Sequence, residues 1–374
     1  MFFENDNAHL QLKNQLVQLY LTNRVPHALL FGGKEGSGHF QLAMFFAKVL
    51  LCKEVNSGPC GQCSSCKKID NFNHPDLHFS FPIHLSKSEK SEVSDDQRAS
   101  FVSMVKEYHS IGKQVWYAKM GNENKQGVIG VKEGHEIIKK LQLKSYEGGK
   151  KILIIWLPEL MNVQAANKLL KLIEEPPEKT NLIFVSDRSE QLLQTISSRL
   201  QQIIVPPLEN TFVSTYLQSH FNVEKNDANM LSKSAGGNLH KAIYKHFNNE
   251  KSQEFLAQFV QWMRLCYSRN ISDTIDWVND FSKRGRETNK EFLKYTLELF
   301  RQCITNHYML SMDGLSLEEE QFLMKFKPFI NHKNIIGLNE VINEAYYHVE
   351  RNANIKITML DVSLQLYKLI RNSK

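Results

Sequence analysis

The stretch LLFGGKEGSGHFQLA, from Leu29 to Ala43, constrains the fold of this chain more than any other. A short apolar run leads into closely spaced glycines, and a helical pattern follows. Glycines at this point let backbone N–H groups surround a phosphate at the start of a helix. The pattern G-x-x-x-x-G-K-[ST] fits at Gly33 and Gly38, with a further glycine at Gly36. The stretch therefore predicts the first strand, loop and helix of a nucleotide-binding α/β domain.

The loop lacks both of its chemical side chains. His39 stands where a lysine would reach the phosphates, and Phe40 stands where a Ser or Thr hydroxyl would bind magnesium. Histidine is shorter than lysine and mostly neutral near pH 7, and phenylalanine has no oxygen to offer a metal. We interpret the loop as degenerate. A chance match, with no nucleotide site ever present, is the alternative.

Strand and helix patterns alternate up to residue 205. The unbroken apolar runs at 150–156 and 181–186 are typical of strands buried on both faces of a parallel sheet. ATPases of this design end the strand at 150–156 with an Asp for magnesium and often a Glu for water. Here Trp156 and Leu157 occupy those positions. The sequence thus predicts an α/β sheet domain from which a second catalytic element is missing.

Beyond residue 206 only helical periods occur, and 374 residues suffice for two or three domains. We expect an α/β domain at 1–206, a small helical domain at 207–248 and a larger helical domain at 249–374. The polar stretch at 86–126 is expected to be a surface insertion, partly helical around 101–108.

Four of the six cysteines lie close together, and their spacing is C-x7-C-x2-C-x2-C. Four thiolates suit a tetrahedral zinc ion and leave no open position for water, so the metal would be structural. An iron–sulfur cluster and a metal-free cluster are the alternatives, and a disulfide fits poorly in a cytoplasmic chain. The expected ligands, in the module at about 52–66, are Cys52, Cys60, Cys63 and Cys66.

Composition limits the class of protein only broadly. Hydrophobic residues make up 42% of the chain and charged residues 23%, as in soluble globular proteins. We find neither a membrane-length apolar run nor a secretory signal pattern, so the expected location is the cytoplasm and no membrane partner is expected. The net charge of +6 favours acidic partners, nucleic acid among them, only weakly.

Several motifs resemble one family, the δ′ subunits of the bacterial DNA polymerase III clamp loader. RVPHALLFGGKEGSGHFQLA resembles the family's first strand and loop, and the inserted cysteine run resembles the zinc module of its γ/τ and δ′ subunits. AANKLLKLIEEPP resembles the helix after the Walker B strand and is highly specific. TISSRLQQI resembles the Ser-Arg-Cys stretch, with Leu200 in place of the cysteine.

The resemblance implies an AAA+ domain, a helical lid and a helical collar that assembles the ring. In that family δ′ does not hydrolyse ATP, and it completes the site of a neighbouring subunit with the arginine that matches Arg199. The lid turn GGNLHKA has His240 where AAA+ proteins usually have arginine. Lys168 and Lys171 lie on a helix that faces DNA in related loaders, although a solvated helix face explains them equally well.

The implied role is a non-catalytic subunit of the polymerase holoenzyme, active in DNA replication. Its implied partners are the γ/τ motor subunits, the δ subunit and, through the complex, the sliding clamp and primed DNA. Structural zinc is the expected metal, and no ATP is expected in this chain. One alternative is an active γ/τ-type ATPase. Another is a free-standing zinc-containing DNA-binding protein with a relict nucleotide fold.

Overall fold

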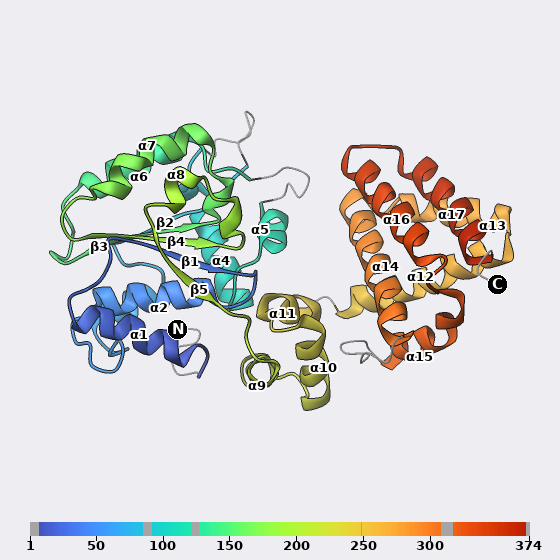
Figure 1. Cartoon of the computed structure of the whole chain (residues 1–374), viewed down its shortest axis with the longest axis horizontal. Coiled ribbons are helices and arrows are strands. Elements are labelled where there is room, and N and C mark those ends of the chain that lie inside the picture. The colour runs from blue at the N-terminus through green and yellow to red at the C-terminus, as the bar shows by residue number, and fades with distance from the viewer. Residues whose placement is uncertain (1–6, 85–91, 121–126, 248, 308–316, 372–374) are drawn as a thin grey trace. The chain divides into compact units, whose positions relative to one another are not determined.

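The computed structural model describes residues 7–84, 92–120, 127–247, 249–307 and 317–371 (Figure 1). The chain forms two compact units, Met1–Ile243 and Tyr244–Lys374. The first unit contains a five-stranded sheet, and the described part of the second unit is helical. The helical lid at 207–248 and the collar at 249–374 stay predictions, because the two units give no test of these three-domain boundaries.

Five parallel strands form the sheet in the order β2-β3-β4-β1-β5. Every residue of β3 and β4 is buried, as the unbroken apolar runs predicted. The carboxyl ends of β1 and β4 lie side by side, because Gly32 pairs with Ser186. The strands are β1 (Ala28–Gly33), β2 (Leu77–Ser80), β3 (Lys151–Trp156), β4 (Thr180–Ser186) and β5 (Gln201–Val205).

Helices cover both faces of the sheet, which confirms the predicted α/β class (Figure 1). α1 (Leu10–Leu21) and α2 (His39–Leu51) lie on one face, and α6 (Val131–Gln142) and α7 (Val163–Glu174) lie on the other. Asn162 caps α7 by accepting a hydrogen bond from the Ala165 backbone N–H at 2.7 Å. Shorter helices are α3 (Ser64–Asp70), α4 (Arg98–Tyr108), α5 (Lys113–Lys119) and α8 (Gln194–Ser197).

The expected surface insertion at 86–126 is wrong for its central part. α4 is helical as predicted, but Phe101 and Trp116 are 1% and 0% exposed. The Phe101 ring stacks on Phe81 from the chain after β2, with ring centroids 4.2 Å apart. Polar residues flank this segment, so the average polarity of 86–126 did not indicate that one face of its helices is apolar. The residues at 86–91 and 121–126 lie outside the described part of the chain.

The helices that follow β5 form two further cores. In the first unit α9 (Asn210–Phe221), α10 (Lys225–Ala235) and α11 (Leu239–Phe247, which runs past the unit boundary) pack around Leu217 and Ile243. The second unit has its own apolar core, in which Cys266 and Cys303 are buried. Its helices are α12 (Asn249–Ser268), α13 (Ile271–Ser282), α14 (Arg286–His307), α15 (Leu317–Phe326), α16 (Ile335–Glu350) and α17 (Ile355–Arg371).

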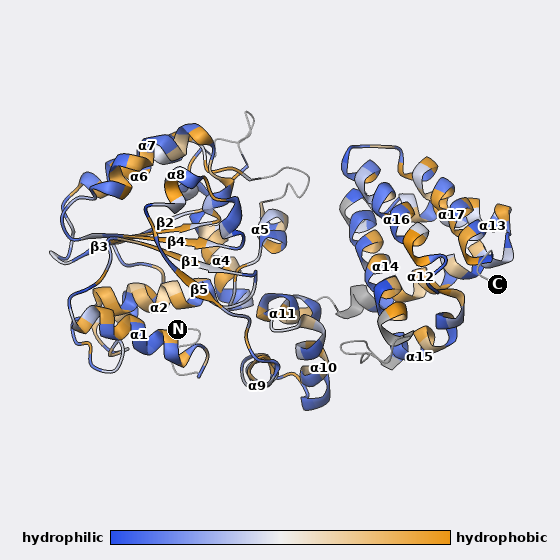
Figure 2. Cartoon of the chain, in the orientation of Figure 1, coloured by the Kyte–Doolittle hydropathy of each residue, from blue (hydrophilic) through white to orange (hydrophobic). Residues whose placement is uncertain are grey.

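Hydropathy follows the layers: the strands are largely apolar, and most helices carry polar residues on one side and apolar residues on the other (Figure 2). This pattern is that of elements which bury one face in an apolar core and expose the other. None of the helices in the described ranges is long and apolar enough to cross a membrane.

Candidate functional sites

The degenerate loop lies between β1 and α2, where a phosphate-binding loop belongs. Gly38 precedes α2 with a φ of 86°, a left-handed conformation that a glycine adopts without strain. The residues that sequence analysis assigned to the loop, Gly33 to Phe40, are therefore placed together as expected. The side chains at the altered positions, however, contact other protein groups in place of a nucleotide.

His39 is held by protein groups on both ring nitrogens. Its Nε2 lies 2.9 Å from Asp187 Oδ1, and its Nδ1 lies 2.9 Å from Ser37 Oγ. Because a carboxylate only accepts, Nε2 donates to Asp187, while Nδ1 shares a hydrogen bond with the Ser37 hydroxyl. The His39 side chain is 2% exposed. The position of the phosphate-binding lysine is thus occupied by a buried, hydrogen-bonded imidazole.

The other three altered positions belong to the core. Phe40 is 1% exposed and meets Phe101 edge to face at 6.0 Å. Trp156 is also 1% exposed and lies 5.8 Å from Phe101, while Leu157 is 2% exposed. Among the described residues, Trp156 Nε1 has no hydrogen-bond partner. Aromatic and aliphatic side chains therefore occupy the positions at which an ATPase has its ligands for magnesium and its base for the attacking water.

The chain that follows α10 closes over the loop. The backbone N–H of Leu239 donates to the Gly36 carbonyl at 3.0 Å. Gly36 has a φ of 74°, and a Cβ there would lie 1.9 Å from Asn238 Oδ1. Asn238 Oδ1 itself accepts from the Lys241 backbone N–H at 2.7 Å. The amide of Asn238 is consequently fixed directly against the glycine loop.

His240 stands at the position where an arginine is usual, but its ring is buried and hydrogen-bonded within the protein. It is 3% exposed, and its Nδ1 lies 2.9 Å from Ser110 Oγ. Burial lowers its pKa to about 4, so the ring is neutral at pH 7. Gly112 makes room for it, since a Cβ there would lie 1.9 Å from His240 Nε2. A neutral, buried ring cannot replace an arginine beside a phosphate.

Two glutamate side chains beside the loop have raised pKa values. Burial and the nearby Asp187 carboxylate raise the pKa of Glu35 to about 7. Burial also raises the pKa of Glu159, whose carboxylate accepts from Ser186 Oγ at 2.8 Å. Both carboxyl groups are therefore less ionised near pH 7 than an exposed glutamate.

The four cysteines of the predicted metal centre come together. Their Sγ atoms all lie within 4.8 Å of one another. A tetrahedral zinc site with Zn–S bonds of about 2.3 Å places its sulfurs about 3.8 Å apart. Backbone N–H groups donate to three of the sulfurs: Cys60 N to Cys52, Cys63 N to Cys60 and Cys66 N to Cys63, at 3.2, 3.4 and 3.4 Å. The donor set fits zinc.

The pKa values of the cysteine thiols also favour a bound cation in the cluster. Burial raises the pKa of Cys52 and of Cys66, so neither ionises readily without a cation. Burial also opposes ionisation of Cys63, but backbone N–H groups of Lys53 and Cys66 outweigh it and lower its pKa to about 6. A divalent ion would offset the repulsion of four thiolates in this setting.

Ion pairs attach the cysteine module to the α/β unit. Lys48 of α2 is 1% exposed and pairs with Asp70 at the end of α3 at 2.8 Å. On the other side, Glu147 accepts from Ser65 Oγ at 3.1 Å and pairs with Lys68. His74 and His78 do not belong to the group of four ligand atoms; His78 lies within β2.

Arg199 follows α8 and precedes β5 on the surface of the unit. Its Nε donates to Glu174 Oε1 at 2.5 Å, and its Nη1 donates to the Thr195 carbonyl at 2.7 Å. The Arg199 side chain is 36% exposed. Lys168 and Lys171 are exposed on α7, where Lys168 Nζ lies 2.7 Å from His135 Nε2.

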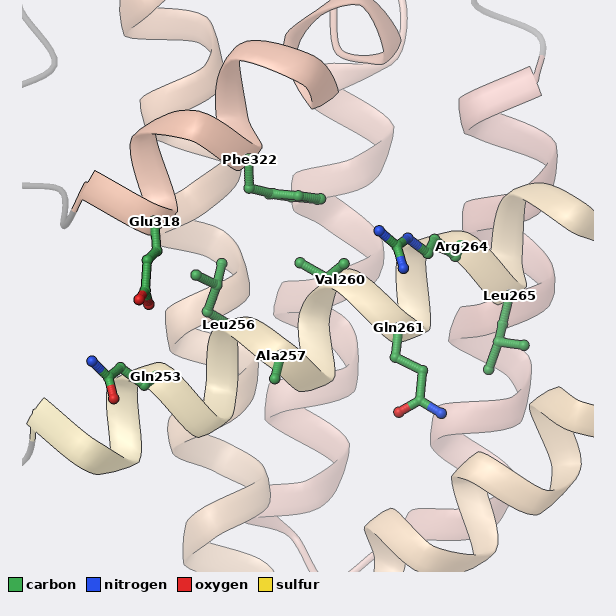
Figure 3. Close-up of a pocket in the computed structure, with 9 residues that line it drawn as sticks. All are labelled: Gln253, Leu256, Ala257, Val260, Gln261, Arg264, Leu265, Glu318 and Phe322. Carbon is green, nitrogen blue, oxygen red and sulfur yellow. The ribbon is translucent and has the colours of Figure 1, made fainter.

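The second unit has an open groove of about 590 Å³ between α12 and α15 (Figure 3). Leu256, Val260 and Phe322 line it with apolar surface, and Glu318 and Arg264 lie at its two ends. This mixture is typical of a surface on which helices pack rather than of a catalytic site.

Sequence analysis missed two residues of the loop site. Asp187 directly follows β4, which neighbours β1, so both strands end at the same edge of the sheet. An acidic residue at the end of a buried strand was the available signal. Asn238 lies about 200 residues from the loop in sequence, and no local pattern indicates that it reaches Gly36.

The sheet, the glycine loop after its first strand and the helices beyond β5 define an α/β domain of the AAA+ class with a helical extension. Residues 8–209, more than half of the chain, match the family model described as DNA polymerase III, delta subunit. The chain therefore belongs to this family.

Curated relatives agree with the family match. The DNA polymerase III subunit delta′ of Bacillus subtilis is 30% identical over 187 residues, which are 50% of this chain and 44% of that protein. The delta′ subunit of Haemophilus influenzae is 27% identical over 347 residues, 89% of this chain and 86% of that protein. The chain thus aligns with less than half of the first relative and with most of the second.

A crystal structure of a DNA polymerase III gamma subunit-related protein from Thermotoga maritima covers 96% of this chain and all of its own. Sequence identity is 13% and the TM-score is 0.43. A TM-score this low adds nothing to the assignment, which stands on the family match.

Proposed function

We propose that this chain is a non-hydrolysing δ′ subunit of a DNA polymerase III clamp loader. In this role it joins γ/τ motor subunits and a δ subunit, and the assembly loads the sliding clamp on primed DNA. The proposal draws on the family match and on the δ′ names of the relatives. Helices α9–α11 would form the lid and the second unit the collar.

The observation that carries the non-hydrolysing role is the double hydrogen bond of His39. A phosphate loop works because a flexible lysine and free backbone N–H groups meet an incoming anion. Here the side chain at the lysine position is committed to Asp187 and Ser37, and Asn238 lies against Gly36. The His39 side chain is satisfied by the protein itself, so a nucleotide that used this position would have to break these contacts.

This geometry disfavours the γ/τ-type ATPase. Phe40 and Trp156 are core residues, and replacing them with a hydroxyl and a carboxylate would open the aromatic cluster around Phe101. Restoring lysine and threonine through His39→Lys and Phe40→Thr should therefore not restore hydrolysis. Magnesium and the attacking water would still lack Walker B carboxylates at Trp156 and Leu157.

Four cysteines at the observed separation would hold one structural zinc ion per chain. The ion would join the loop after α2 to α3 and so order the module.

Arg199 is the residue that the δ′ role assigns to a neighbour's ATP site. An exposed guanidinium just after α8 suits such contact, since its cationic N–H groups can donate to phosphate oxygens.

Titration calorimetry of the isolated chain with Mg-ATP tests the closed site. We expect no heat of binding at up to millimolar ATP, while an intact γ/τ subunit under the same conditions serves as the positive control. A micromolar dissociation constant for this chain would overturn the claim that its own loop is closed to nucleotide.

A further inference from the structure

We infer that Glu174 is a positioning residue that sets the orientation of the Arg199 guanidinium and thereby governs how Arg199 is presented to a neighbouring subunit. The inference rests on the proposed function, because it concerns the use of Arg199 in trans. Glu174 belongs to the run LIEEPP, whose two carboxylates have no other assigned role.

The backbone of Glu174 is held in place by helix α7, one face of which is buried. Glu174 is the last residue of α7, and the neighbouring Leu172 and Ile173 are 8% and 1% exposed. Pro176 and Pro177 follow, and a residue before proline disfavours helical backbone, so the helix ends at a fixed point. The carboxylate of Glu174 is therefore delivered to the surface from an anchored backbone.

Arg199 is anchored in the same way at its backbone. Leu200 is 9% exposed and belongs to the apolar cluster that also contains Ile173 of α7. The Arg199 Cα is thus held close to the end of α7, while its long side chain has four flexible torsions. Fixing those torsions is the task left for polar contacts.

Two hydrogen bonds restrain these torsions, one from Nε and one from Nη1. Nε donates to Glu174 Oε1 and Nη1 donates to the Thr195 carbonyl, with a longer 3.5 Å contact from Nη1 to Ser198 Oγ. Within the described ranges, Nη2 has no hydrogen-bond partner. Nη2, with its two N–H groups, remains available to an external anion.

The pair contributes little to folding. Both side chains are partly exposed, 36% for Arg199 and 48% for Glu174, and exposed ion pairs stabilise proteins by about 0–1 kcal/mol. Holding a long side chain in one orientation before an encounter, however, removes an ordering cost at the moment of catalysis. Loss of the carboxylate should therefore affect the reaction far more than the fold.

The experiment measures ATP hydrolysis by the reconstituted clamp loader with DNA and clamp present. It compares wild-type chain with Glu174→Ala, Glu174→Gln, Arg199→Ala and the double variant Glu174→Ala/Arg199→Ala. Glu175→Ala, a change at the adjacent exposed glutamate, is the matched control. Size exclusion confirms assembly and thermal denaturation confirms folding for each variant.

At the ATP site that Arg199 serves, we expect Glu174→Ala to lower kcat by roughly two- to tenfold with an unchanged KM for ATP. Glu174→Gln keeps an acceptor for Nε and should lose less, and Glu175→Ala should match wild type. The double variant should be no slower than Arg199→Ala, because Glu174 acts only through Arg199.

The outcomes separate the inference from the proposed function. If Arg199→Ala lowers the rate and Glu174→Ala does not, or raises it, the positioning role is wrong and the function stands. A further loss in the double variant would likewise place Glu174 in some other role. If Arg199→Ala itself has the wild-type rate in an intact complex, the in-trans function fails and the inference fails with it.

Discussion

Replacing Phe101 with alanine tests the claim that the positions of lost nucleotide chemistry have become core. The Phe101 ring is 1% exposed and lies 4.2 Å from the Phe81 ring, with Phe40 and Trp156 at 6.0 and 5.8 Å. Truncation of a buried phenylalanine removes its apolar burial and leaves a cavity, at a cost of about 3–5 kcal/mol. We expect the upper part of that range, because aromatic pairs add to area burial.

Hydrogen exchange followed by mass spectrometry is the suitable assay, since the two compact units need separate readouts. Core amides of the first unit should lose roughly two to four orders of magnitude of protection, which corresponds to the expected free energy. Peptides from the second unit should be unchanged. Ser103→Ala, at an exposed position of α4, is the control. Protection of the first unit equal to that of the control would refute the argument that this segment is core.

Three further predictions follow from the cysteine module and the loop. One zinc ion per chain should co-purify, and Cys63→Ser should release it and loosen the module while the sheet stays folded; metal analysis finding iron, or no metal in a fresh anaerobic preparation, contradicts this. Glu35, with its pKa raised to about 7, binds a proton more readily in the folded chain, so its contribution to stability is lost as pH rises from about 4.5 through about 7. Glu35→Gln should therefore stabilise the chain at pH 8 and much less at pH 5 in chemical denaturation, and an equal effect at both values would refute the burial of that carboxylate. The variant with His39→Lys and Phe40→Thr should show no ATPase activity and a lower melting temperature; turnover above background would contradict the reading of Trp156 and Leu157.

Much of the structure of the first unit could be predicted from local sequence patterns. The strand at β3 was predicted because a run buried on both faces is apolar throughout, and the motif AANKLLKLIEEPP indicated the helix α7. The cysteine spacing predicted a cluster that the structure brings together. Each of these features depends on residues close together in the sequence.

Features that depend on distant residues were not predictable in the same way. The partner of His39 is Asp187, and the cover of Gly36 is Asn238, both brought in by the tertiary fold. The burial of Phe101 and Trp116 was missed because charged residues surround them in sequence. Overall polarity describes the exposed face of α4 and α5, whereas the fold is set by the few residues on the other face.

The most direct test of the central claim is hydrolysis and clamp loading by a complex that carries Arg199→Ala. Arginine fingers contribute about 10³–10⁵ in rate at the site they serve, or about 4–7 kcal/mol, although a ring with several ATP sites loses less in total. The account predicts an assembled, folded complex with depressed DNA- and clamp-stimulated ATPase and impaired loading, and poor rescue by Arg199→Lys, which lacks the planar fork. Wild-type rates in a verified complex with Arg199→Ala would contradict it and leave Arg199 as the surface partner of Glu174.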